Sequence, residues 1–212
     1  FQNTLGDERF DLVIALDAGD LTRYGALYDN HRAFLASATI LNIDHHISSH
    51  GCGVVNIIDP LAAATGELIT LFQQQAGLPL NPDAAQCLLT GVITDTRSFQ
   101  YSSTTPRTLE VGALLLHAGA SPEIIAKAVY YTRPAQQARF QAAVIGSMQL
   151  ACDGRLAWSY ANADMLQTTG ATPEMDDNLS GMLRDIEGVQ IAALFKNYGE
   201  TNTTFLSLRC AA

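Results

Sequence analysis

An aspartate and two histidines stand next to one another directly after a short apolar run. The run, Ile40–Ile43, is typical of a buried strand, and Asp44, His45 and His46 follow it. In an open α/β sheet, ligands bind just past the carboxyl ends of the strands, so these side chains are expected at a functional site. Neighbours in an extended segment point to opposite faces, which predicts different roles for the histidines, one toward a metal and one toward a substrate.

Two further apolar segments end at an aspartate. Asp17 follows Leu12–Leu16, and Asp95 follows Leu88–Thr94. With the Asp-His-His they predict a metal site built from strand ends, although either acid alone could be a solvated or loop-capping residue. Carboxylates with an imidazole suit Mn²⁺, or Mg²⁺ with water, whereas structural zinc more often recruits cysteine, which these motifs lack. Because a pair of such ions can activate water and neutralise a phosphoryl group, phosphoester hydrolysis is favoured over redox chemistry.

Composition narrows the class of protein. The 212 residues suit one large domain or two small ones, and a 48% hydrophobic content is enough for a packed core. The net charge of −9 argues against a coat for long double-stranded DNA or RNA, but it leaves room for a short anionic substrate held by a metal and an arginine. We expect no membrane association, because no apolar run is long enough to span a bilayer. The first residues show no signal-peptide pattern and the cysteines are widely spaced, so free thiols and a cytoplasmic location are expected.

Strand and helix patterns alternate in the first part of the chain, which predicts a Rossmann-like parallel sheet of the α/β class. After Arg133-Pro134 the pattern changes to that of a smaller α+β domain. Strands are expected over Phe10–Leu16, Thr39–Ile43, Val54–Ile58, Arg155–Tyr160, Val189–Tyr198 and Thr203–Arg209. Helices are expected from Thr22 through Phe34, over Ala62–Ala76, from Thr105-Pro106 and Ser121-Pro122, and over Ala135–Leu150, Ala163–Gln167 and Pro173–Ile186. The segment before Asp95 is ambiguous, because Asn81-Pro82 predicts a helix from Ala84 to about Val92, whereas the metal-site argument treats Leu88–Thr94 as a strand.

The chain resembles the DHH phosphoesterases, whose name-giving motif stands here as Asp44-His45-His46. The likeness is greatest to the nanoRNase group, bifunctional oligoribonucleases that also remove the 3′-phosphate of phosphoadenosine phosphate (pAp). Val13–Asp17 is similar to the family's second motif, and Gly91–Phe99 is similar to its fourth. Thr204–Arg209 resembles a strand of the DHHA1 substrate domain that follows the catalytic domain in this family.

The resemblance implies a site and a substrate class. Two Mn²⁺ ions are expected, with Mg²⁺ or Co²⁺ as substitutes, and the substrates would be short oligoribonucleotides, pAp, or linear or cyclic dinucleotides. The implied metal ligands are Asp17, His45 and Asp95, while Asp44 would orient the metal-binding histidine and His46 would face the scissile phosphate. The implied substrate-binding residues are Arg209, Arg97 and Phe99, although Arg97 and Arg107 could equally be paired or solvated and Phe99 could be a packing residue.

The resemblance also implies a domain plan: residues 1–119 form the DHH domain, 120–135 a linker and 136–212 the DHHA1 domain, with a short nucleotide held between them. The family's first motif, a histidine with two aspartates, and its glycine-rich motif after the Ser-Leu-Arg strand are both missing from the sequence. We therefore expect a chain truncated at both ends, with most ligands of the first ion absent and the activity of this polypeptide alone impaired or lost.

Other functions remain open. One alternative is a RecJ-like single-strand exonuclease or a pyrophosphatase of the same superfamily. Another is a non-catalytic module that binds a nucleotide. The sequence leaves the oligomeric state open, with a homodimer among the alternatives.

Overall fold

The computed structural model describes residues 10–199 and 203–210. The chain divides into two compact units, Phe1–Lys127 and Ala128–Ala212. The division lies inside the segment expected to be a linker, although part of that segment forms a helix, α6 (Pro122–Val129). The domain names implied by the resemblance stay predictions, and each unit is described by itself below.

The first unit is built on a parallel three-stranded sheet, which confirms the predicted α/β class. Its strands are β1 (Val13–Leu16), β2 (Ile40–Asp44) and β3 (Val55–Ile58), in the spatial order β1-β2-β3. In the register, Leu16 pairs with Ile43 and Asp44 pairs with Ile58. The carboxyl ends of all three strands therefore lie at one edge of the sheet, where the chemistry-bearing residues follow.

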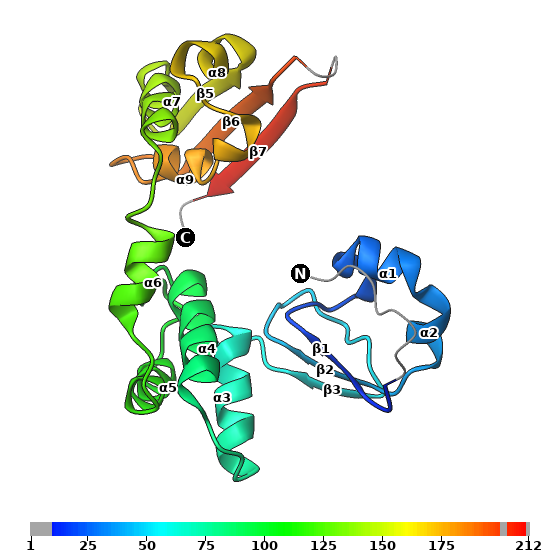
Figure 1. The fold of residues 1–212 in the computed structure, drawn as a ribbon. Coiled ribbons are helices and arrows are strands. Elements are labelled where there is room, and N and C mark those ends of the chain that lie inside the picture. The colour runs from blue at the N-terminus through cyan, green and yellow to red at the C-terminus, as the bar shows by residue number, and fades with distance from the viewer. Residues whose placement is uncertain (1–9, 200–202, 211–212) are drawn as a thin grey trace. The chain divides into compact units, whose positions relative to one another are not determined.

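Three helices of the first unit pack side by side, α3 (Thr65–Gln75), α4 (Pro82–Asp95) and α5 (Pro106–His117) (Figure 1). Local signals set where two of them begin. The Asn81 side chain accepts a hydrogen bond from the Ala84 N–H, and Thr105 forms a capping box with Thr108. Their apolar faces form a buried cluster that includes Leu89, Val92 and Leu115. This cluster fixes both ends of α4, including the end that carries Asp95.

Two local predictions for the first unit were wrong. Leu88–Thr94 is not a strand, because α4 continues to Asp95, and its apolar residues recur at helical spacing toward the buried cluster. The single helix expected from Thr22 to Phe34 is instead a 3₁₀ turn followed by two short helices. Asp20, not Thr22, caps the turn, and Gly25, with φ of 54°, breaks the helix. The three elements are η1 (Leu21–Tyr24), α1 (Ala26–Asn30) and α2 (Arg32–Ser37).

The second unit contains a four-stranded mixed sheet with helices packed on it, in agreement with the expected α+β arrangement (Figure 1). β4 and β5 are antiparallel, β5 and β6 are parallel, and β6 and β7 are antiparallel. The strands are β4 (Gln149–Ala151), β5 (Leu156–Asn162), β6 (Ile191–Asn197) and β7 (Phe205–Cys210). The helical elements are α7 (Ala135–Gly146), α8 (Ala163–Thr169), the 3₁₀ turn η2 (Pro173–Met175) and α9 (Leu179–Arg184).

Two helices of this unit are shorter than the sequence predicted. The expected helix Ala135–Leu150 ends at Gly146, because the following residues pair with β5 as strand β4. The expected helix Pro173–Ile186 is interrupted at Asn178, whose φ of 53° is left-handed. The predicted hairpin turn between β6 and β7 includes residues 200–202, which lie outside the described residues.

No single helix in the described parts of the chain is long and apolar enough to cross a membrane. α5 and α6 pass such a test by length and composition only as a pair, and they are bent by 103° relative to each other.

Candidate metal centre

The predicted site residues of the first unit lie at the ends of three elements. Asp17 follows β1 with a left-handed φ of 60°, and its backbone N–H donates to the Ile43 carbonyl at 3.0 Å. Asp44 is the last residue of β2, and His45 and His46 follow it beyond the strand. Asp95 is the last residue of α4. The site therefore combines two strand ends with a helix end, not three strand ends.

The side chains of these residues converge. His45 Nε2 lies 3.6 Å from Asp17 Oδ1 and 3.6 Å from Asp95 Oδ2. His46 Nδ1 lies 3.8 Å from Asp17 Oδ1, and the candidate ligand atoms of Asp17, His45 and His46 are all within 4.8 Å of one another. The fold thus brings together the residues expected to bind a metal, and their role as ligands remains a prediction.

The two histidines do not point to opposite faces as the strand rule predicted. Their ring centroids are 4.6 Å apart in an edge-to-face arrangement, and both rings approach Asp17. The rule does not apply here because β2 ends at Asp44, so neither histidine has the alternation of a strand.

Asp44 holds His46 through its side chain. Its fully buried carboxylate accepts a 2.7 Å hydrogen bond from His46 Nδ1, and Oδ1 also accepts from the backbone N–H groups of His45 and His46. Burial raises the pKa of the Asp44 carboxyl, but these hydrogen bonds outweigh burial and hold the pKa below its ordinary value. The sequence argument expected Asp44 to orient the metal-binding histidine, whereas its side chain contacts the ring of the other one.

The ring of His45 is instead oriented by a backbone carbonyl. His45 Nδ1 lies 3.3 Å from the Ala62 oxygen, which can only accept, so Nδ1 carries the proton. The lone pair of Nε2 then faces the carboxylates of Asp17 and Asp95. Three electron-rich groups that face one point are stabilised by a positive charge between them, which a bound cation or a second proton on the ring would supply.

The negative charge of the Asp95 carboxylate is also in an unfavourable environment when no cation is bound. It stands at the carboxyl end of α4, where the helix dipole is negative and a carboxylate is unfavourable. Burial raises the pKa of Asp95, and the nearby Asp17 carboxylate raises it further, while the two histidines act in the opposite direction. A carboxylate in this unfavourable position does not stabilise the fold, so a role as a ligand of a cation explains its presence better.

The loop after Asp95 carries the predicted substrate residues Arg97 and Phe99. Arg97, Ser98 and Phe99 all have positive φ, between 50° and 64°, a strained conformation for residues other than glycine. Buried Thr96 holds this loop, because its hydroxyl donates to the Val92 carbonyl and accepts from the Phe99 N–H. The Phe99 ring packs on the helical cluster next to Gly112, which accounts for its position by packing. Substrate contacts of Arg97 and Phe99 stay predictions.

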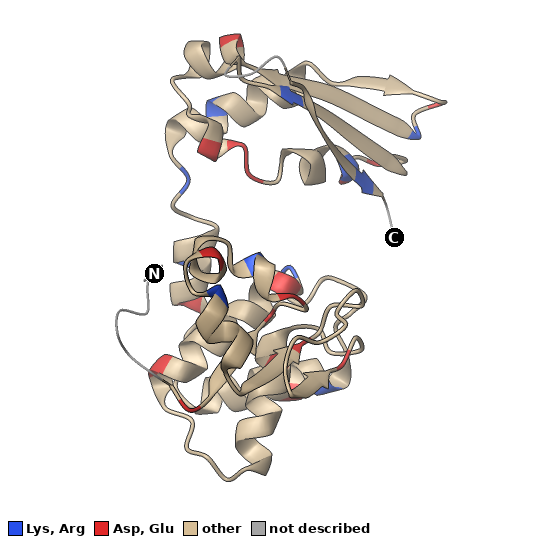
Figure 2. Ribbon diagram, turned by 90° about the vertical axis from the view of Figure 1, so that its right-hand side faces the viewer, with Lys and Arg blue, Asp and Glu red and all other residues tan. Residues whose placement is uncertain are grey.

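Arg209, the other predicted substrate residue, lies on β7 in the second unit. It is exposed and lines an open hollow of about 620 Å³ together with Lys196, Tyr198 and Ser207. Asp176 in the same hollow accepts hydrogen bonds from Lys196 Nζ and the Tyr198 hydroxyl. Lysine and arginine positions are few and scattered over the described elements, not gathered along one of them (Figure 2).

Sequence reasoning missed several polar residues that support the centre. Asn42 is fully buried in β2 and donates to the carbonyls of Ala15 and Ala18, which fixes the turn that contains Asp17. Thr65 Oγ1 donates to Asp17 Oδ1 at 2.7 Å, and Glu67 is a fully buried carboxylate. A polar residue inside an apolar strand was a signal for Asn42, whereas Thr65 and Glu67 look like ordinary residues of a helix start.

No family model matches the sequence. The chain is 28% identical over 161 residues to the bifunctional oligoribonuclease and PAP phosphatase NrnA of Thermus thermophilus, which covers 76% of this chain and 48% of that protein. It is 26% identical over 187 residues to the NrnA protein of Bacillus subtilis, which covers 87% of this chain and 58% of that protein.

A solved structure of another protein has the same fold. The structure matches that of an exopolyphosphatase-related protein from Bacteroides fragilis with a TM-score of 0.87 and 22% identity, over 95% of this chain and 59% of that one. The resemblance to the DHH phosphoesterases is confirmed. The chain spans about half the length of the first curated relatives that it matches. In this DHH-like chain, Asp44, His45 and His46 stand at the centre of the cluster described above.

Proposed function

We propose that the first unit carries the metal centre of a DHH-type phosphoesterase. Its substrates would be short oligoribonucleotides, pAp, or linear or cyclic dinucleotides, and its preferred metal would be Mn²⁺. The observation that carries the proposal is the position of His45 Nε2, 3.6 Å from the carboxylates of both Asp17 and Asp95, with His46 beside them. The oligoribonuclease and PAP phosphatase names of the relatives support the same reaction class.

The donor set fits a divalent cation. It combines carboxylate oxygens with imidazole nitrogen and contains no thiolate, a set suited to Mn²⁺ more than to structural zinc. Asp17, His45 and Asp95 would hold the ion, and the left-handed backbone of Asp17 is compatible with a functional constraint. A bound ion would supply a more acidic water molecule and neutralise charge on the phosphoryl group.

The remaining residues would act on the substrate. Since Asp44 accepts from His46 Nδ1, the other ring nitrogen, Nε2, is left to face the substrate, and with a proton on Nε2 it would donate to a phosphate oxygen. Asp44 keeps this ring in one orientation, because its carboxylate is fully buried and bound by the backbone on the same side. Arg209 would bind a terminal phosphate in the second unit, where the guanidinium is exposed at the rim of a hollow.

Metal binding and turnover test the proposal together. The chain is titrated with Mn²⁺ by calorimetry and then incubated with the dinucleotide pApA, with AMP release followed by chromatography. We expect Mn²⁺ binding that is strongly weakened but still measurable in Asp17→Asn and lost in His45→Ala, and AMP release that needs Mn²⁺ and is lost in His46→Ala. Release at a rate well below that of a full-length relative still supports the centre, because the chain spans about half of such a protein.

A matched variant separates the site from general effects. His117→Ala removes an exposed histidine of α5 whose ring, among the described residues, is hydrogen-bonded to its own helix, so binding and turnover should be unchanged. A chain that binds no Mn²⁺ would overturn the proposal. Binding of Mn²⁺ and pAp with no turnover, also in a chain extended to the length of the relatives, would favour a non-catalytic nucleotide-binding module.

A further inference from the structure

The first turn of α3 touches two of the residues proposed to bind metal. Thr65 Oγ1 donates to Asp17 Oδ1 at 2.7 Å, and the Ala62 carbonyl, just before the helix, accepts from His45 Nδ1. Thr65 is 5% exposed and Ala62 is 3% exposed, so water does not compete strongly for either contact. The helix start thus reaches the carboxylate and the imidazole from one side.

The hydroxyl of Thr65 is not used as a helix cap. The N-cap position of α3 is Ala64, which makes no side-chain capping hydrogen bond, and Thr65 is the first helical residue. Hydroxyl residues are favoured at the N-cap, where they satisfy free backbone N–H groups. Here the hydroxyl stands one position later and donates to Asp17, which lies 48 residues away in the sequence.

A buried carboxylate holds this turn in place. Glu67 is fully buried, and its Oε2 accepts from the Ala63 N–H and from the Thr108 hydroxyl. Its Oε1 accepts from Arg107 Nε, and Arg107 Nη2 also donates to Asp59. Ala63 lies between the carbonyl that binds His45 and the hydroxyl that binds Asp17, so Glu67 fixes the segment that makes both contacts.

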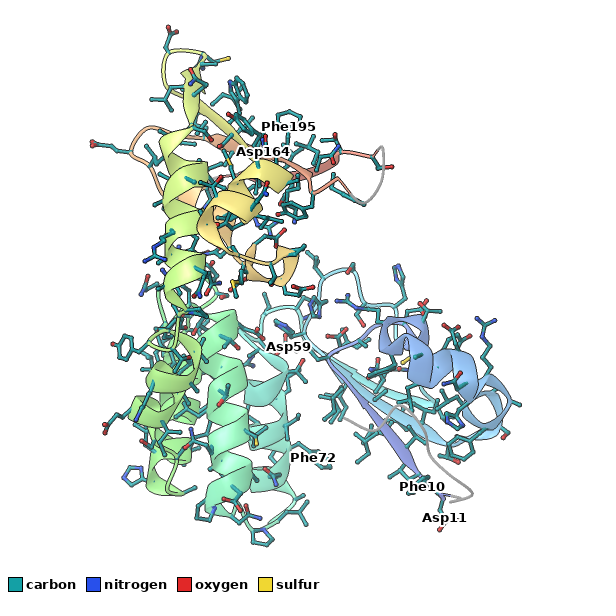
Figure 3. All side chains as sticks on the ribbon, turned by 45° about the horizontal axis from the view of Figure 1, so that its top comes forward. Phe10, Asp11, Asp59, Phe72, Asp164 and Phe195 are labelled. Carbon is teal, nitrogen blue, oxygen red and sulfur yellow. The ribbon has the colours of Figure 1, made fainter. Side chains whose placement is uncertain are left out.

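Asp59 connects the same network to the strand ends. It follows β3, and Figure 3 shows it between the sheet and the helices of the first unit. Its backbone N–H donates to the Asp44 carbonyl at 3.2 Å, and its own carbonyl accepts from the Ala62 N–H at 3.0 Å. Burying the Glu67 carboxylate is costly even with the partly exposed Arg107 beside it, so a role in fixing one geometry is the better explanation for this residue.

We propose that Thr65 and Glu67 are positioning residues of the metal centre. Thr65 fixes the rotamer of Asp17 by a direct hydrogen bond, and Glu67 fixes the turn whose Ala62 carbonyl sets the tautomer of His45. This inference rests on the proposed metal site, because it assigns the two residues a role toward the ligands of that site. Neither residue contacts the cation or the substrate in this proposal.

The first experiment compares Thr65→Val with Thr65→Ser. Valine has nearly the same shape and lacks the hydroxyl, whereas serine keeps it. We expect Thr65→Val to weaken Mn²⁺ binding, measured by calorimetry, about 10- to 100-fold, the usual cost of removing a group that orients a metal ligand. Thr65→Ser should restore affinity to within a few-fold of the original chain. Equal affinity of the valine variant and the original chain would overturn the role of Thr65.

A double-mutant cycle shows whether Thr65 acts through Asp17. In an Asp17→Asn background, the valine substitution should cause little further loss of affinity, because the contact that it removes is already altered. If the two losses simply add, Thr65 does not act through Asp17 and this part of the proposal is wrong.

The Glu67 part has a test that needs no metal. Nitrogen-15 NMR of the imidazole rings should show His45 protonated at Nδ1 in the original chain and a mixture of tautomers in Glu67→Gln, while exposed His117 serves as the internal reference. Arg107→Lys, which keeps a cation beside Glu67, should retain the original spectrum. An unchanged His45 signal in a folded Glu67→Gln variant would overturn the role of Glu67.

These tests separate two kinds of failure. An original chain that binds no Mn²⁺ refutes the proposed metal site before any variant is compared. An original chain that binds Mn²⁺, with Thr65→Val and Glu67→Gln variants that match it in affinity and spectra, refutes only the positioning role.

Discussion

Asp95 should be a residue that weakens the fold and strengthens metal binding. Its carboxylate lies at the negative end of the α4 dipole and close to the carboxylate of Asp17. Replacing it in Asp95→Asn keeps the shape and removes the charge. A charge of the unfavourable sign at a helix terminus costs about 0.3–1 kcal/mol, so the variant should be more stable by about that amount without metal.

The effect should change sign when metal is added. Mn²⁺ at a concentration of about 100 times its dissociation constant would stabilise the original chain by about 2.7 kcal/mol. Asp95→Asn should lose most of this gain, because one of the proposed ligands is weakened. The variant is then the more stable protein in a chelator and the less stable protein in Mn²⁺.

Hydrogen exchange of the α4 amides measures this locally. The chain's one tryptophan, Trp158, lies in the second unit, so its fluorescence would report on unfolding of that unit and not on α4. We expect exchange of the most protected amides to slow about 2- to 5-fold in Asp95→Asn without metal, and Mn²⁺ to slow the original chain about 100-fold, since about 1.4 kcal/mol is a factor of ten.

Asp83→Asn is the matched control, because Asp83 lies in the first turn of the same helix, where a negative charge is favourable. It should speed exchange without metal and keep the full effect of Mn²⁺. The reasoning is refuted if Asp95→Asn speeds exchange in a chelator, or if Mn²⁺ protects it as fully as the original chain.

Three further predictions concern stability. Burial and the hydrogen bond to Asp176 raise the pKa of the Tyr198 phenol above its usual value, so this stabilisation is present below the unfolded pKa of about 10 and is lost as pH rises through the folded value. Tryptophan fluorescence in denaturant should show that alkaline loss in the original chain and not in Tyr198→Phe, which should also be less stable by about 1.5–3 kcal/mol at neutral pH. Gly91→Ala in α4 should stabilise the first unit by about 0.5–1 kcal/mol, because a Cβ there meets nothing within 4 Å. By contrast, Gly66→Ala should destabilise the first unit by about 1–3 kcal/mol, because the added Cβ would lie 2.7 Å from a backbone carbonyl oxygen of α4. The thermal unfolding of the two variants is compared with that of the original chain. Burial raises the pKa of Asp59, but hydrogen bonds from a backbone N–H and from the Arg107 guanidinium outweigh burial, so the pKa lies below its ordinary value. The stability that Asp59 contributes is therefore present above a pH of about 4 and lost as pH falls through the lowered value. Hydrogen-exchange protection of the α3 amides, measured as the pH is lowered, should show this loss of stability. In Asp59→Asn the acid-induced loss should be smaller.

The sequence by itself determined the local elements and the kinds of residue at the site. The Asn81-Pro82 and Thr105-Pro106 starts predicted α4 and α5 correctly, because a helix start depends on residues within one turn. The apolar runs before Asp17 and Asp44 predicted two of the three strands of the parallel sheet for the same reason. The Asp-His-His stands at the end of such a run, and its position at a sheet edge follows from that alone.

Tertiary structure decided which atoms meet. That Asp95 arrives from a helix, that Asp44 binds the ring of His46, and that Thr65 and Glu67 reach the centre all depend on contacts between residues far apart in the sequence. β4 likewise forms only because β5 pairs with it, whereas its sequence continues the pattern of α7. Local preferences are set by a few neighbouring residues, but the orientation of a buried side chain is set by the groups packed around it, and only the folded chain brings those groups together.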